Sequence, residues 1–498
     1  MPVKGMKDEP VEVKDTLKLP EEFVIALKMG DAMYIAQESD GYVTPLPGCF
    51  IKTNNGFIIS ELTIVKGMKA TKDVKGIVTE VPATFPIIFY NKNGERSHCS
   101  TEDNINFNGN SISFKKVKVR FEEIPHTLMS LDTGKRFLKG EVKEIKDIYP
   151  ILKAKQSRFI SFQWDTRLYD LLTCNTIGTY FFDVFGVFPI TWFFGVTDTG
   201  KSRGLMCLVY AARKGIYWED VTNPTVKRMA DFLQPTLGID EYQDVEHILR
   251  GHVRSCYKEG VSSPRLEESR DGWVLRAFAI FHPTVIASTE EIDYASFTRT
   301  IPIKMMKGNP IEDRDPTEYD FDDNRDDLYI CRLTQANKVY ETFQTLRKAG
   351  LGLLGREWEI WRAPLTIAKM VSEEVFNNVL NLAREICSSK KEELYVEEKD
   401  VLIAIYSLFD TPLKPKTIFF FPKEITEKIW TEKKEEFTAN EWKDDDEFKK
   451  KYSPQNLSYV LRRMKIESKY VTKGTRYKMT SGEYNTLAVN FGIMKSED

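Results

Sequence analysis

The segment from Gly195 to Ser202 has residue types and a spacing suited to binding phosphate. It reads Gly-Val-Thr-Asp-Thr-Gly-Lys-Ser, which matches the pattern G-x-x-x-x-G-K-[ST]. Two glycines let the backbone curl, so that successive N–H groups point at phosphate oxygens. Lys201 would reach the β- and γ-phosphates of ATP, and Ser202 would bind Mg²⁺. We expect nucleotide contacts from the whole segment: Gly195, Val196, Thr197, Asp198, Thr199, Gly200, Lys201, Ser202 and Arg203.

The neighbouring sequence favours this interpretation over that of an ordinary turn before a helix. An apolar run from Phe188 leads directly into the glycine segment, as a buried strand would. Residues 205–212 are also apolar and suit a buried helix. A strand, a loop and a helix in this order are the context that the phosphate-binding pattern requires. The sequence therefore predicts an α/β nucleotide-binding domain.

Two later segments end in polar residues that suit nucleotide hydrolysis. The apolar residues 237–239 precede Asp240 and Glu241. Asp240 would hold Mg²⁺, directly or through water, and Glu241 would polarise the attacking water as a general base. An exposed acidic turn is the alternative interpretation. The next apolar strand ends in Ser288 and Thr289, which are the candidates for sensing the γ-phosphate.

Arginines mark a predicted hairpin and the start of a further strand. Asp271-Gly272 is a hairpin turn signal between two short strands. From this hairpin we expect Arg265 and Arg270 to contact DNA phosphate. Arg299 comes just before an apolar strand, where it could act as an arginine finger in the site of a neighbouring subunit. A surface arginine without a function is the alternative.

Together these elements resemble the AAA+-type ATPases of viral and plasmid replication helicases. The similarity is greatest to superfamily 3 and to the related helicase domains of phage and archaeal mobile-element replication proteins, and it covers residues 160–390. It rests on the glycine segment, on Asp240-Glu241, on the hairpin and on the sequence Ala-Ser-Phe-Thr-Arg-Thr-Ile-Pro-Ile from residue 295. One departure is that many members have Asn where this chain has Ser288-Thr289. The resemblance implies a hexameric ring that hydrolyses ATP and moves on DNA.

The composition is that of an ordinary globular protein without a strong overall charge. Of 498 residues, 42% are hydrophobic and 29% are charged, and the net charge is −3, so any basic surface must be local. The seven cysteines include no C-x-x-C pair, which predicts neither a zinc site nor a disulfide framework. Scattered thiols suit a reducing cytoplasm. No apolar run reaches the roughly 18 residues of a membrane span, so we expect a cytoplasmic protein without membrane contact.

The C-terminal region combines a helix and a hairpin with a local excess of positive charge. Residues 451–480 contain eight Lys or Arg and a single acidic residue. A helix followed by a basic hairpin is the pattern of a winged helix, which places its helix in a DNA groove. We expect DNA contacts from Arg462, Arg463, Lys473 and Arg476. A winged helix that binds protein is the alternative.

The sequence thus predicts five segments in order. The N-terminal domain, residues 1–125, is β-rich, with strands expected at 57–65, 77–81, 85–90 and 112–121. A helical linker follows at 126–187, then the phosphate-loop ATPase core at 188–308. An acidic, solvated loop and a helical lid are expected at 309–390, and the winged helix at 391–498.

Three functions are compatible with this organisation. The first is a ring-forming, ATP-dependent DNA helicase that replicates a virus or mobile element, with single-stranded DNA in its pore and duplex DNA at the winged helix. The second is an ATP-dependent initiator or loader that binds an origin without unwinding it. The third is a DNA-binding regulator that does not hydrolyse ATP, which the intact Lys201, Ser202, Asp240 and Glu241 disfavour.

Overall fold

The computed structural model describes two compact units, residues 1–379 and 380–498. The described residues are 25–29, 32–36, 42–43, 45–72, 78–108, 110–115, 125–269, 272–394, 396–410, 416–433, 449, 452–472 and 474–490. Among the helices in these ranges, none combines the length and the apolar character that crossing a membrane requires.

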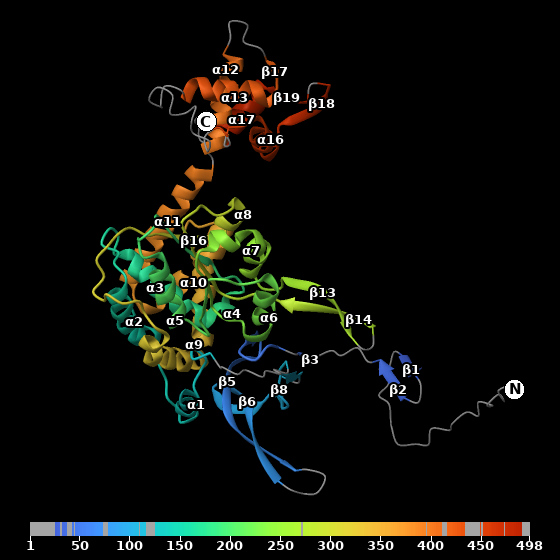
Figure 1. Ribbon diagram of the computed structural model, residues 1–498, viewed down its shortest axis with the longest axis vertical. Helices are drawn as coiled ribbons and strands as arrows, with labels where there is room; N and C mark the ends of the chain where they lie inside the picture. Colours follow the sequence, from blue (N-terminus) through green and yellow to red (C-terminus); the bar gives the residue numbers. More distant parts are fainter. Residues whose placement is uncertain are drawn as a thin grey trace, which may run out of the picture. The chain divides into compact units, whose positions relative to one another are not determined.

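A five-stranded parallel sheet forms the centre of the first unit (Figure 1). Its order is β11-β12-β15-β10-β16, and every neighbouring pair is parallel. The strands are β10 (Ile190–Phe194), β11 (Ile216–Trp218), β12 (Leu237–Ile239), β15 (Thr284–Ser288) and β16 (Thr300–Lys304). All of β15 and nearly all of β10 are buried, which explains their continuous apolar sequences. The prediction of an α/β fold is confirmed, and the sheet at its centre is parallel.

Helices pack on this sheet and beside it. Those between the strands are α5 (Lys201–Ala211), α6 (Asn223–Leu233), α7 (Tyr242–Cys256) and α8 (Tyr294–Phe297). Before the sheet come α1 (Leu131–Leu138), α2 (Ile145–Phe159), α3 (Arg167–Gly178), η1 (Thr179–Phe181) and α4 (Phe182–Phe185). After it come η2 (Glu318–Phe321), α9 (Asp322–Lys348), α10 (Arg356–Val371) and α11 (Glu373–Leu394). The hairpin of β13 (Ser262–Ser269) and β14 (Gly272–Ala279) extends away from the sheet (Figure 1).

The N-terminal region consists of strands in small sheets. They are β1 (Ile25–Met29), β2 (Ala32–Ala36), β3 (Tyr42–Val43), β4 (Phe50–Thr53), β5 (Gly56–Lys72), β6 (Val78–Lys92), β7 (Glu95–Ser100), β8 (Asn104–Phe107) and β9 (Asn110–Ser113). Where the sequence predicted separate strands at 77–81 and 85–90, the structure has the single strand β6. Pro82 and Pro86 do not interrupt it because β7 pairs only from residue 87 onward, so both prolines lie where β6 is an edge. Most of the predicted strand 112–121 lies outside the described residues.

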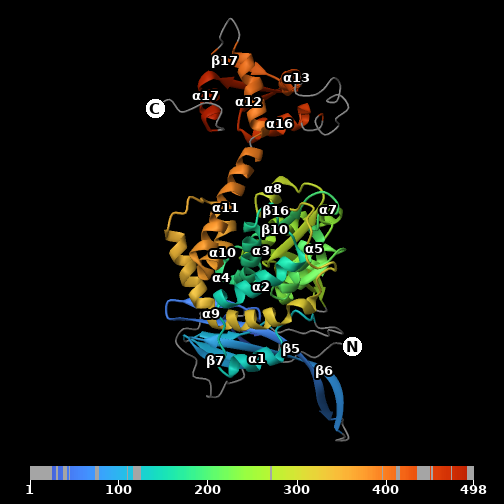
Figure 2. The same cartoon turned by 90° about the vertical axis from the view of Figure 1, so that its left-hand side faces the viewer.

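A buried network of charges joins the N-terminal strands to the rest of the unit, where α9 runs past β5 (Figure 2). Glu61 of β5 is fully buried and pairs with Arg213 at 2.6 Å, Lys214 at 2.7 Å and Arg332 at 3.0 Å. Arg332 also pairs with Asp183 at 2.7 Å. Burial alone would raise the pKa of Glu61, but the three cations outweigh it and hold that pKa well below its usual range. Burial, together with the charge of Arg213, lowers the pKa of Lys214 to about 7.

The second unit has a three-stranded antiparallel sheet of order β17-β19-β18 with helices around it. Its strands are β17 (Thr417–Phe420), β18 (Glu467–Val471) and β19 (Gly474–Thr480). Its helices are α12 (Val396–Phe409), α13 (Pro422–Lys433), α16 (Pro454–Arg463) and α17 (Ser481–Asn490). The hydroxyl of Ser453 caps α16 by accepting from the N–H of Asn456 at 3.4 Å. Leu457, Leu461 and Tyr477 belong to its apolar core.

Candidate nucleotide-binding site

The chain between β10 and α5 curls into a tight loop. Gly195 has a φ of 153° and Gly200 a φ of 84°, values at which a side chain would be strained. A Cβ on Gly195 would also lie 2.5 Å from the carbonyl oxygen of Met305. Asp198 has a φ of 60°, which aspartate tolerates better than most residues. The backbone of the loop therefore needs its two glycines where the sequence has them.

Lys201 begins α5, and its side chain lies within the loop. It is only 7% exposed, and its ammonium donates a hydrogen bond to the carbonyl of Val196 at 3.1 Å. The hydroxyl of Thr199 donates to the same carbonyl at 2.7 Å. The first N–H groups of α5 have no carbonyl partner within the helix, and this positive end of the helix attracts anions. An ammonium and several N–H groups thus converge where a phosphate could bind.

A cavity of about 620 Å³ adjoins the loop at the carboxyl edge of the sheet. Loop residues 197–203 line it, together with Glu241 after β12 and Thr289 after β15. Met305, which follows β16, and Asp315 also line the cavity. The volume lies within the range of cavities that hold small-molecule ligands. In parallel α/β sheets, such ligands bind outside the carboxyl ends of the strands.

The two carboxylates after β12 have different surroundings. Asp240 is 4% exposed and accepts hydrogen bonds from the hydroxyl of Tyr217 at 2.8 Å and from the N–H of Glu241 at 2.9 Å. Burial and the neighbouring carboxylates raise the pKa of Tyr217 well above its usual range, so its hydroxyl remains a donor. Glu241 is exposed and lines the cavity, with a φ of 43° that turns the chain into α7. Sequence reasoning missed Tyr217, which lies in an apolar strand without a motif.

The two candidate sensors also differ. Ser288 is buried, accepts a hydrogen bond from the indole N–H of Trp192 at 2.8 Å and donates to the carbonyl of Glu290 at 2.7 Å. Thr289 is exposed and lines the cavity. Its N–H donates to the amide oxygen of Gln243 at 3.3 Å, and the amide nitrogen of Gln243 donates to Glu241. Gln243, which no motif had singled out, therefore bridges Thr289 and the carboxylate.

Arg203 binds the acidic segment, residues 309–327, which we expected to be a solvated loop. Its guanidinium donates to Asp315 at 2.9 Å and to the carbonyls of Glu312 and Asp313 at 3.2 and 3.1 Å. The last part of the segment is the start of α9, where acidic side chains are favoured by the positive end of the helix. Arg203 therefore anchors the part of the segment around Asp315 beside the cavity, and the start of α9 orders its last part.

Arg299 lies at the opposite edge of the sheet from the cavity. It precedes β16, and its carbonyl accepts from the N–H of Ile190, the first residue of β10. Five residues of β10 separate this edge from the loop, a distance of roughly 16 Å. The guanidinium donates to the carbonyl of Ala295 and lies over the ring of Tyr257, at 5.2 Å from its centroid. Arg299 therefore points away from the cavity of its own chain.

The expected DNA contacts on the hairpin are only partly described. Arg265 of β13 is exposed, and its register partner on β14 is Arg276. Arg270, at the tip of the hairpin, lies outside the described residues.

The expected DNA contacts in the second unit are likewise partly described. Arg462 on α16 and Arg476 on β19 are exposed. The guanidinium of Arg476 lies over the ring of Phe419, at 4.7 Å from its centroid. Lys473 and the side chain of Arg463 lie outside the described part of the chain.

No family model and no curated protein match this chain. Among solved structures it is similar to the active helicase Cch of SCCmec type IV, with 12% identity and a TM-score of 0.36 over 89% of this chain and 99% of that one. A full-length MCM homologue from Methanopyrus kandleri has 12% identity and a TM-score of 0.31, over 66% and 76%. The apo C-terminal region of NrS-1 has 12% identity and a TM-score of 0.31, over 83% and 96%. At this level of similarity, we infer the function from the site itself.

Proposed function

We propose that this chain binds Mg²⁺-ATP in the cavity beside the glycine loop and hydrolyses it. The observation that carries the proposal is that one cavity is lined by the loop, by Glu241 and by Thr289. Lys201 would exchange its hydrogen bond to Val196 for the β- and γ-phosphates. Hydroxyl and carboxylate oxygens are ligands that Mg²⁺ prefers, so Ser202 and Asp240 would hold this ion. When bound, it would neutralise charge on the phosphates.

Glu241 is the residue best placed to act as the general base. Its carboxylate lines the cavity, whereas Asp240 is buried and held by Tyr217. A base must lie within hydrogen-bonding reach of the water that it activates. Gln243 would keep Glu241 oriented. It would also connect this base to Thr289, the proposed sensor of the γ-phosphate.

Arg299 would act on a second copy of the chain. It lies across the sheet from its own cavity, so a catalytic contact with phosphate requires a neighbouring subunit. An arginine supplied in this way stabilises the charge of phosphoryl transfer. We therefore propose a homo-oligomeric ring, a hexamer, with one ATP at each interface.

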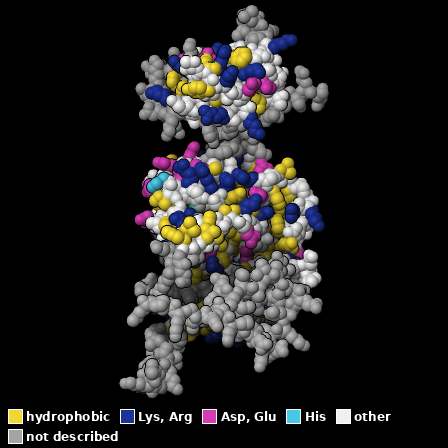
Figure 3. All heavy atoms as spheres, turned by 90° about the vertical axis from the view of Figure 1, so that its right-hand side faces the viewer, with side chains coloured by type: hydrophobic (Ala, Val, Ile, Leu, Met, Phe, Trp, Pro, Cys, Tyr) yellow, Lys and Arg dark blue, Asp and Glu magenta, His cyan; other side chains and the backbone are white. Residues whose placement is uncertain are grey.

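Two features of the chain support DNA as the other partner. The hairpin carries Arg265 on a strand that extends from the sheet and would contact single-stranded DNA in the pore of the ring (Figure 1). In the second unit, a helix is followed by two antiparallel strands, which is the order of a winged helix. Lys and Arg side chains are spread over the face of this unit that Figure 3 shows. The exposed Arg462 and Arg476 would contact duplex DNA. The proposed function is an ATP-dependent DNA helicase.

The first experiment measures ATP turnover by Lys201→Ala beside the matched control Lys338→Ala. Lys338 is an exposed lysine on α9, away from the cavity. We expect Lys201→Ala to lose turnover while keeping the circular dichroism of the wild type, and Lys338→Ala to retain both. Normal turnover by Lys201→Ala would refute the assignment of the site.

A second experiment separates the helicase from an ATP-driven loader and tests the ring. ATP turnover is measured with and without single-stranded DNA while Arg299→Ala is mixed with wild type in increasing proportion. A DNA helicase predicts that single-stranded DNA stimulates ATP turnover. A site shared between subunits predicts that the mutant lowers the turnover of the mixture by more than its share. Turnover equal to the weighted average of the two proteins would contradict trans action by Arg299. Turnover without strand displacement on forked DNA would identify a loader instead.

A further inference from the structure

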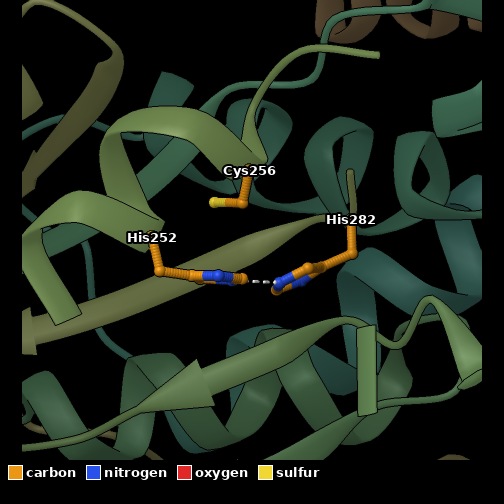
Figure 4. A group of neighbouring side chains, drawn as sticks. All are labelled: His252, Cys256 and His282. Carbon is orange, nitrogen blue, oxygen red and sulfur yellow. Dashed lines mark hydrogen bonds between the residues drawn. The ribbon is translucent and has the colours of Figure 1, made fainter. Parts of the chain in front are cut away.

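Two histidines and a cysteine meet in the core of the first unit, away from the nucleotide cavity (Figure 4). His252 and Cys256 lie four residues apart on α7, so they share one face of the helix. His282 comes from the segment that leads into β15. All three side chains are buried, and their potential ligand atoms lie within 4.8 Å of one another.

The hydrogen bonds of this cluster define which ring nitrogens carry protons. Nδ1 of His282 lies 2.9 Å from the carbonyl oxygen of Pro283, which can only accept, so Nδ1 carries the proton. Nε2 of His282 is then an acceptor, and it lies 2.9 Å from Nε2 of His252. Histidines that bind metals usually donate their other N–H to a carbonyl or carboxylate in this manner. His282 is therefore oriented as a metal ligand would be.

His252 reaches the cluster through its Nε2 atom, which lies 2.9 Å from Nε2 of His282. The Nδ1 atom of His252 is buried and has no hydrogen-bond partner among the described residues.

We propose that His252, Cys256 and His282 bind one Zn²⁺ ion. Zinc takes nitrogen ligands at about 2.0–2.1 Å and thiolate at about 2.3 Å in a tetrahedron, which places the ligand atoms about 3.3–3.6 Å apart. The two Nε2 atoms would separate by about 0.4 Å and Sγ would close in by at most about 1.2 Å. The hydroxyl of Thr284, 3.2 Å from Sγ, or a water would fill the fourth position. On binding, the Cys256 thiol loses its proton to solvent, and the imidazole proton between the rings moves to Nδ1 of His252.

The ion would fix the base of the β13–β14 hairpin. Cys256 ends α7 just before this hairpin and His282 follows directly after it, and the N–H of His282 donates to the carbonyl of Cys256 at 3.2 Å. Zinc would add a second link between the same two points. Because α7 starts beside Glu241 at the other edge of the sheet, the role of the ion would be structural rather than catalytic.

The test is the metal content of the untagged chain. The protein is purified without chelator, and its bound metals are measured by elemental mass spectrometry. We expect about one zinc per chain in the wild type and in Cys174→Ser, which removes a buried thiol outside the cluster. Cys256→Ser and His282→Gln should lose at least nine-tenths of it. A Co²⁺-loaded wild type should show a thiolate-to-cobalt absorption band that Cys256→Ser lacks.

Three outcomes would overturn the proposal. One is a folded wild type that contains no zinc after incubation with Zn²⁺ and gel filtration. Another is copper in place of zinc at this stoichiometry, which would exclude zinc as the resident ion. The third is zinc retained at the wild-type level by both cluster variants, which would place it elsewhere in the chain.

Discussion

Replacing Glu61 by glutamine should destabilise residues 1–379 by about 3–5 kcal/mol, the usual cost of breaking a buried ion pair. The substitution keeps the shape of the side chain and removes only its charge. Glu61 is fully buried and lies within 2.6–3.0 Å of nitrogen atoms of Arg213, Lys214 and Arg332. Without Glu61, Arg332 would keep its pair with Asp183, whereas Arg213 and Lys214 would lose the carboxylate with which they pair.

The assay is urea denaturation of the full-length chain, followed by tryptophan fluorescence at pH 6 and pH 8.5. Because the pKa of Lys214 is about 7, this lysine is charged at pH 6 and largely neutral at pH 8.5. In the glutamine variant, Lys214 loses the charge of Glu61 that raises its pKa, so it releases its proton at a lower pH than in the wild type. At pH 6 only the wild type gains from the charged pair, whereas at pH 8.5 this lysine is largely neutral in both proteins. We expect the loss of stability to be larger at pH 6.

The matched control is Glu95→Gln on β7, in the same sheet as β5. Glu95 forms an exposed pair with Lys92 at 3.3 Å, and its loss should cost no more than about 1 kcal/mol. If Glu61→Gln costs no more than this control at both pH values, Glu61 is not the buried partner of these cations, and the account of the network is wrong.

Two other predictions concern the site and the network. Tyr217→Phe removes the hydroxyl that holds Asp240 at 2.8 Å; a hydrogen bond to a charged group contributes about 1.5–3 kcal/mol, so ATP turnover should fall at least tenfold while the circular dichroism is retained. Unchanged turnover would show that this bond does not position Asp240. Between pH 7 and pH 10, unfolded Lys214 binds a proton that the folded protein lacks, so the free energy of unfolding should rise with pH by at most about 1.4 kcal/mol per unit. Lys214→Met should lose this rise, and an identical pH profile in that variant would contradict the lowered pKa.

The sequence was most informative where a function depends on neighbouring residues. The loop from Gly195 to Ser202, and the polar residues after β12 and β15, are local patterns that require only a strand followed by a turn. A parallel sheet then brings the carboxyl ends of its strands to one edge, which is how Glu241 and Thr289 come to line the cavity beside the loop. The sequence could not distinguish Ser288 from Thr289, because only the packing of Trp192 shows which hydroxyl is buried.

Contacts between distant segments could not be predicted. Arg213 and Lys214 are ordinary cations in the sequence, and their partner Glu61 lies about 150 residues earlier on an apolar strand. The histidine–cysteine cluster was missed for the same reason, since its third member reaches it only through the fold around the β13–β14 hairpin. Spacing rules for metal sites require ligands in short pairs, whereas here one pair spans a helical turn and the last ligand comes 26 residues after Cys256.

One helix connects the nucleotide cavity to the charge network. α5 begins at Lys201 and ends at Ala211, about 17 Å away, and Arg213 and Lys214 follow it directly. The loop holds one end of this helix and Glu61 holds the cations just beyond the other, so Glu61→Gln alters the second anchor without touching the first. Reduced stability with unchanged ATP affinity would mean that the two ends act independently. A loss of both would mean that α5 transmits the state of the N-terminal strands to the phosphate-binding loop.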